Sequence, residues 1–271
     1  MDILYILSFD FMRRAFLAGA LVGASCAILG VFLVLRKEAM IGHGLSHVTF
    51  GGVAIGLMFN LPPLAAALAF TLLAALWINA IKDRSGLGGD TGIGIVSSLG
   101  MALGVTLASI AGDFNAELFS YLFGSILAIS PAEVWIAGGI ALVTIGTLAL
   151  FYNELVYATF DNQTARTAGI QVGRLDMLIA ILTAVTVVTG MKVVGLLLVA
   201  ALMVIPAAAG LSLAASFRQA VSMAVLFAII SVSGGLILAF GLDWPASGSI
   251  VLLNGLILGV ALTFRRRYRW I

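Results

Sequence analysis

Charged side chains are scarce in this sequence. Only 10% of its 271 residues are Asp, Glu, Lys or Arg, whereas about 25% are charged in an ordinary soluble domain. Hydrophobic residues make up 62% of the chain. The Lys and Arg residues form short clusters and no long basic tract, which argues against nucleic-acid binding. The composition is typical of a membrane protein that crosses the bilayer many times.

Cysteine is nearly absent as well. Cys26 is the only one and lies inside an apolar run, so no intrachain disulfide can form and the redox state of the compartment cannot be inferred. The first twelve residues do not resemble a cleavable signal, because Asp2 stands where a basic region belongs and Asp10 interrupts the apolar stretch.

Two sequence features that would couple the protein to a source of energy are absent or weak. No GxxxxGK[ST] sequence occurs, and the Gly-rich residues 85–94 lack both the lysine and the preceding strand of a phosphate-binding loop. The acidic residues after the first segment lie in loops or near the ends of apolar runs, so coupling to protons or sodium through carboxylates inside the membrane is only weakly supported. We therefore expect neither an ATP site of its own nor an enzyme.

Nine apolar runs are bounded by charges or by Pro and Gly turns. Because about 20 residues span a bilayer as a helix, they predict an all-α, polytopic membrane bundle of eight to nine transmembrane helices. Short connections leave no room for a soluble domain, so residues 1–271 are expected to form one transmembrane domain. The runs are 15–35, 41–59, 62–81, 92–111, 133–151, 174–190, 193–214, 218–240 and 246–264.

Lys and Arg clusters predict the orientation, since they favour the cytoplasmic side. Five clusters alternate consistently along the chain and place the C-terminus in the cytoplasm: Arg36 with Lys37, Lys82 with Arg84, Arg166 with Arg174, Arg218, and the terminal group from Arg265 to Arg269. Arg13 and Arg14 disagree with this arrangement. The topology of the first segment therefore stays open.

Two loops are unusual. Residues 119–130 are apolar but too short to span, which predicts either a re-entrant or interfacial helix or an extension of a neighbouring span. Residues 157–176 are the most polar part of the chain and lie on the cytoplasmic side. Asp161 can cap a short helix there and Gly169 can end it. The segment is interpreted as a docking helix, with a solvated linker as the alternative.

Glycines at four-residue spacing, such as Gly52 with Gly56 and Gly100 with Gly104, are typical of close helix packing in lipid. We expect no ligand role for them.

His43 and His47 are the only histidines and lie within one predicted span. Residues four apart share a helix face, and neutral imidazole is a good ligand for zinc and a poor one for magnesium or calcium. The pair therefore predicts a metal contact. Gly44 stands where an HExxH protease has its glutamate, which argues against a hydrolase. The alternative is that each histidine is a packing residue, hydrogen-bonded to Ser46, Thr49 or a carbonyl group.

One helix supplies two ligands, whereas a closed zinc site has four. The remaining ligands would come from other helices, from water, or be absent, and Ser46 or an acid at the outer mouth is a candidate. An incomplete site suits transport, since an ion in transit must be released again.

Five segments over nearly the whole chain resemble the membrane permease subunit of bacterial zinc/manganese/iron ABC transporters, the ABC-3 family. They are GALVGASCAILGVFLVLRKEAMIGHGLSHVTFGGVAIG at 19–56, SYLFGSILAISP at 120–131, FDNQTARTAGI at 160–170, VVGLLLVAALMVIPAAAG at 193–210 and DWPASG at 243–248. In this family the second helix usually reads G-D-x-[LI]-[SA]-H, with the Asp and His handling the metal. His47 matches that His, and His43 replaces the Asp.

The resemblance implies a multi-pass permease of the bacterial cytoplasmic membrane. Two copies would form a homodimer, pair with ATP-binding cassette subunits and receive metal from an extracytoplasmic metal-binding protein. No cofactor would be bound permanently, and the cargo would be a divalent metal ion. The exchange of carboxylate for the softer imidazole at His43 favours zinc over manganese.

The segment from Thr159 to Ile170 resembles the family's cytoplasmic coupling loop, which would sit in a groove of the ATPase. The coupling residues are Phe160, Asp161, Ala165, Arg166, Ala168 and Gly169. Pro206 is expected to break the helix that begins at Val193. A stand-alone metal carrier or channel driven by an ion gradient is the alternative function, and an intramembrane enzyme ranks last.

Overall fold

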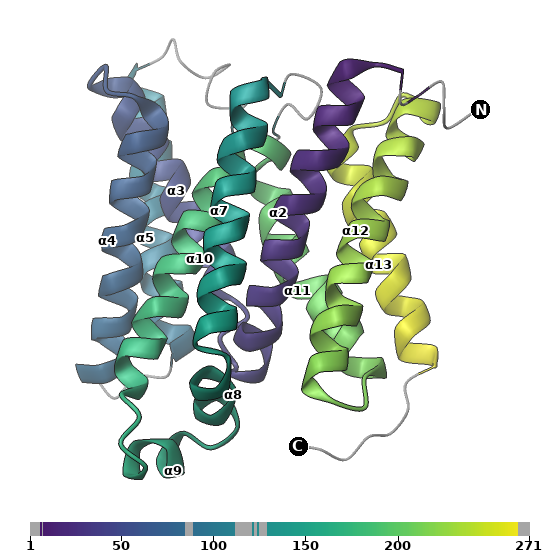
Figure 1. The fold of residues 1–271 in the computed structure, drawn as a ribbon. Coiled ribbons are helices and arrows are strands. Elements are labelled where there is room, and N and C mark those ends of the chain that lie inside the picture. The colour runs from purple at the N-terminus through teal and green to yellow at the C-terminus, as the bar shows by residue number, and fades with distance from the viewer. Residues whose placement is uncertain are drawn as a thin grey trace.

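The computed structural model describes residues 6, 8–84, 89–111, 121, 124 and 129–264. Within these residues, nine helices are long and apolar enough to cross a membrane, which confirms the predicted all-α polytopic bundle (Figure 1). Two shorter helices, α8 and α9, form one end of it. The order is α2 (Asp10–Leu35), α3 (Ile41–Met58), α4 (Pro63–Arg84), α5 (Gly89–Ala111), α7 (Pro131–Leu150), α8 (Tyr152–Phe160), α9 (Asn162–Thr167), α10 (Val172–Val194), α11 (Leu196–Leu213), α12 (Phe217–Leu242) and α13 (Ala246–Thr263).

The predicted cationic clusters gather at one end of the bundle. The α2–α3 connection, the end of α4, the start of α12 and the short helix α9 all lie at the lower end of Figure 1. The clusters at Arg36, Lys82, Arg166 and Arg218 therefore share one side, as the orientation rule predicts. We refer to this end of the bundle as the α9 end. The terminal arginines from Arg265 onward lie outside the described residues.

Helix α2 is a single helix of spanning length. It begins at Asp10, earlier than the expected residue 15, and its 26 residues suffice for one crossing. Arg13 and Arg14 lie in its first two turns, at the end opposite α9. Arg13 pairs with Asp10 at 3.7 Å, and Arg14 Nη1 donates to the Ile129 carbonyl at 3.2 Å. Both side chains have partners at that end.

Helices α2, α3, α10 and α11 form the centre, with most of their residues buried, whereas α4, α5, α7 and α13 lie at the periphery, with only a minority of their residues buried. Glycines allow this close packing, as predicted. A Cβ on Gly52 would lie 2.7 Å from Ala67 Cα on α4, and one on Gly100 would lie 2.7 Å from Val48 Cα on α3. Helix α3 is thus held backbone to backbone by its neighbours.

The expected break at Pro206 is wrong. Helix α11 runs from Leu196 to Leu213 with Pro206 buried inside it. The start of this helix also shifts: Val193 and Val194 belong to α10, and Gly195, with φ 88°, ends α10 and starts α11. In a packed bundle, neighbouring helices stabilise a proline-containing helix that would bend or end in isolation.

The predicted re-entrant segment at 119–130 lies outside the described residues except at positions 121, 124, 129 and 130. Ser130 begins the next helix: it caps α7 reciprocally with Glu133.

Candidate functional site

Helix α3 presents His43 and His47 on a face that no other described helix covers. Every other residue from 41 to 50 is buried, whereas His43 is exposed and His47 is half-buried. The two Nε2 atoms lie 3.1 Å apart and the rings meet edge to face. The predicted helix face is confirmed, and the two Nε2 atoms lie within hydrogen-bond distance of each other.

The neighbouring hydroxyl groups do not serve the histidines. Ser46 donates to the Gly42 carbonyl at 2.8 Å, and Thr49 bonds the Leu45 carbonyl and the hydroxyl of Thr71. In this structure both hydroxyl groups therefore donate to carbonyl groups of α3 and do not bond the two histidines. No group of three or more His, Cys, Asp or Glu side chains that could hold a metal occurs in the part of the chain that the structure describes.

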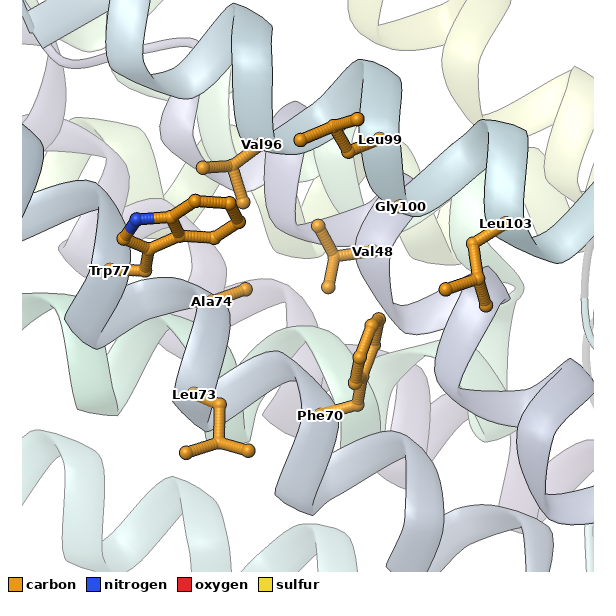
Figure 2. Close-up of a pocket in the computed structure, with 9 residues that line it drawn as sticks. All are labelled: Val48, Phe70, Leu73, Ala74, Trp77, Val96, Leu99, Gly100 and Leu103. Carbon is orange, nitrogen blue, oxygen red and sulfur yellow. The ribbon is translucent and has the colours of Figure 1, made fainter.

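Another side of α3, at Val48, borders an apolar groove of about 370 Å³ between α3, α4 and α5. Figure 2 shows Val48 of α3 between side chains of α4 and α5, with Trp77 and Leu103 on either side of it. Apart from the indole N–H of Trp77, these side chains carry no polar group that could bind an ion. The groove is therefore no route for a metal ion, and the histidine face remains the candidate.

The short helix α9 projects from the bundle beyond the ends of the spanning helices (Figure 1). Its cap is the predicted one: Asp161 accepts a hydrogen bond from the Thr164 N–H at 2.9 Å. Hydrogen bonds from the Thr164 side chain and backbone lower the pKa of Asp161, so its carboxylate remains ionised at neutral pH. Gly169, at φ 86°, ends the helix, and the Ile170 N–H donates to the Ala165 carbonyl across it.

The predicted coupling residues thus form one continuous projection. Ala165 alone among residues 161–169 is buried, and Arg166 bonds the Asn162 side chain at 2.8 Å. Phe160 leaves 46% of its surface exposed while its ring lies 6.1 Å from that of Phe217 on α12. Five of the six predicted residues lie on this exposed surface, and Ala165 is buried beneath it: Phe160, Asp161, Arg166, Ala168 and Gly169 are the exposed ones.

Behind α9 lies a group of charges that sequence reasoning did not connect. Arg36 at the end of α2 pairs with Asp176 on α10, and Lys82 at the end of α4 pairs with both Asp176 and Glu38. Arg36 Nε also donates to Thr159 Oγ1 on α8 at 3.0 Å. We call these five residues the ion cluster. In the sequence, Glu38 lies beside Arg36 and Lys37, and Asp176 lies beside Arg174. The preference for positive charge on the cytoplasmic side explains these cations but not the two acidic residues.

Known proteins match this chain over the whole helix bundle. A family model described as "ABC 3 transport family" matches residues 8–265. The chain is 31% identical over 259 residues to the "High-affinity zinc uptake system membrane protein ZnuB" of Haemophilus influenzae, covering 96% of this chain and 99% of that one. It is 30% identical to the "Manganese transport system membrane protein MntC" of Halalkalibacterium halodurans, covering 96% and 89%.

A solved structure gives the same result. "PsaBC from Streptococcus pneumoniae in complex with Fab" superimposes with a TM-score of 0.87 and 29% identity, covering 99% of this chain and 96% of that chain. The arrangement of helices described above is thus shared along nearly the full length of both chains.

Proposed function

This chain belongs to the ABC 3 transport family, and we propose that it is the permease subunit of an ABC importer that moves a divalent transition metal ion across the bacterial cytoplasmic membrane. Relatives named for zinc uptake and for manganese transport are similarly close. Similarity alone therefore does not choose the metal. ATP is hydrolysed in this proposal by a separate cassette subunit that α9 contacts, and an extracytoplasmic protein delivers the ion.

The observation that carries the proposal is the uncovered histidine face of α3. Imidazoles on a spanning helix are costly against hydrocarbon and persist where they line a pathway or meet a partner. His43 and His47 lie within the first two turns of α3 and converge at 3.1 Å. They act on the metal as cargo, which they bind and release.

The same face explains why one protomer holds only two ligands. A second copy packed on it by two-fold symmetry brings four imidazoles around one ion, the number that a tetrahedral zinc site requires. Separation of the two copies leaves two ligands on each side, which weakens binding and permits release. Four nitrogen ligands favour zinc over manganese, because manganese prefers oxygen.

Uptake by the reconstituted transporter tests this function. We expect proteoliposomes that hold the permease with its ATPase to import zinc with ATP, and the His43→Ala/His47→Ala variant to lose uptake while it still co-purifies with the ATPase. Leu142→Ala, an exposed position on the peripheral helix α7, is the control and should transport normally. Normal uptake by a well-folded double variant would refute the metal assignment.

Two further readouts separate the alternatives. Zinc transport by the permease without any ATPase would favour a stand-alone carrier. Equilibrium zinc binding to the purified permease should saturate at one ion per pair of protomers if the four-imidazole site forms. Saturation at one ion per protomer would contradict the shared site.

A further inference from the structure

We propose that the ion cluster is a positioning network that transmits displacement of α9 to the start of α3 and so to the histidine pair. This inference rests on the proposed function, in which a partner ATPase moves α9. The cluster residues touch no cargo and are positioning residues.

The first link joins α9 to α2. Thr159 lies two residues before Asp161, the N-cap of α9. Its hydroxyl accepts from Arg36 Nε at 3.0 Å and donates to the Leu155 carbonyl within α8. Because Thr159 belongs to the helix that carries α9, a displacement of α9 acts directly on the Arg36 side chain.

The second link fixes Arg36 to the helices around it. The Arg36 side chain is only 7% exposed, and its Nη1 bonds Asp176 Oδ1. The other oxygen of Asp176 faces Lys82 Nζ at 3.4 Å, and Lys82 also bonds Glu38. One carboxylate therefore connects the ends of α2 and α4 to the first turns of α10. A desolvated, charge-assisted arrangement of this kind keeps its geometry better than an exposed ion pair.

The third link is the short connection from α2 to α3. Lys37 adopts φ 59°, the Glu38 N–H donates to the Leu33 carbonyl at 2.8 Å, and the Ile41 N–H donates to the Glu38 carbonyl at 3.0 Å. These bonds leave residues 36–41 little freedom. His43 follows two residues after Ile41, so a shift of Arg36 and Glu38 reorients the first turn of α3, where the metal ligands begin.

A purely structural cluster would behave differently from a transmitting one. If it only stabilised the bundle, weakening it would lower the amount of folded transporter, and ATP hydrolysis and uptake would fall together. If it transmits movement, weakening the Thr159 link should leave hydrolysis intact and lower the zinc imported per ATP hydrolysed. The ratio of the two rates therefore separates the roles.

Thr159→Val is the chosen variant, because it removes the hydroxyl that meets Arg36 and leaves every ion pair in place. Arg36→Lys keeps a cation for Asp176 and loses the second contact. Thr159→Ser retains the hydroxyl and should restore coupling. Thr189→Val is the matched control: Thr189 also bonds the carbonyl four residues before it and is half-buried, but it lies near the far end of α10.

Zinc uptake and ATP hydrolysis are measured in the same proteoliposomes, which contain the permease and its ATPase. We expect Thr159→Val and Arg36→Lys each to lower uptake per ATP by about two- to thirtyfold, the double variant to resemble either single one, and Thr159→Ser and Thr189→Val to resemble wild type.

Unchanged uptake per ATP in Thr159→Val, or hydrolysis and uptake reduced by the same factor, would overturn the network proposal while wild-type transport still supports the proposed function. A wild-type complex that imports no zinc with ATP would overturn the proposed function and this inference together.

Discussion

Asp176 is the most sensitive point of the ion cluster, and Asp176→Asn is expected to destabilise the protein strongly. Its side chain is 11% exposed and accepts from Arg36, which is 7% exposed. Removing one member of a buried ion pair leaves an uncompensated charge and costs about 3–5 kcal/mol. Lys82 adds little to this cost, since it is 32% exposed and keeps Glu38.

The loss can be measured as a change in Tm of the purified permease. In a chain of this size each kcal/mol shifts Tm by about 2–4 °C, so Asp176→Asn should lower Tm by about 6–20 °C. Arg36→Met/Asp176→Leu should recover most of the loss, because replacing both charges by apolar groups is often neutral. Arg166→Ala, at an exposed side chain on α9, should shift Tm little. An Asp176→Asn variant as stable as wild type, or a double variant less stable than the single one, would refute the burial argument.

Three further predictions concern other parts of the molecule. His43→Asp should shift competitive uptake from zinc toward manganese by about tenfold or more, and an unchanged preference would place selectivity elsewhere. Gly30→Ala should lower Tm or prevent folding, because its Cβ would lie 1.7 Å from the Met203 carbonyl oxygen, whereas Gly139→Ala, with open space around it, should be neutral. Asp161→Lys should uncouple ATP hydrolysis from uptake by removing the α9 cap, and Asp161→Asn, which can still cap, should not; equal coupling in both would count against the docking role.

The sequence predicted the helices well because each span is a long apolar run bounded by charge or by a Pro or Gly turn. It predicted α9 from local chemistry, since Asp161 and Gly169 act on residues three to four positions away. It failed at Pro206, because the packing that keeps α11 continuous comes from other helices. The turn after α10 was expected at residues 191–192 and lies at Gly195, a small shift because Lys192 marked the boundary while the glycine conformation that makes the turn has no charge signal.

The site was predictable only in part. Helical spacing placed His43 and His47 on one face, but α3 is apolar on every side, so the pattern could not indicate which face its neighbours leave uncovered. The ion cluster depends on residues from four distant segments and on how the helices cross. No local pattern links Asp176 to Arg36, 140 positions apart.

Both ends of helix α9 are stabilised by residues of the same segment. Asp161 caps its start, the turn at Gly169 ends it, and Ala165 is the one buried residue between them. Such a segment depends little on the helices that carry it. Residues 161–170 should therefore fold largely independently of the bundle. The corresponding segment of a related permease should fold in their place without repacking of the spanning helices. Substitutions on the exposed surface of α9 can therefore accumulate without altering the face of α3 that carries His43 and His47.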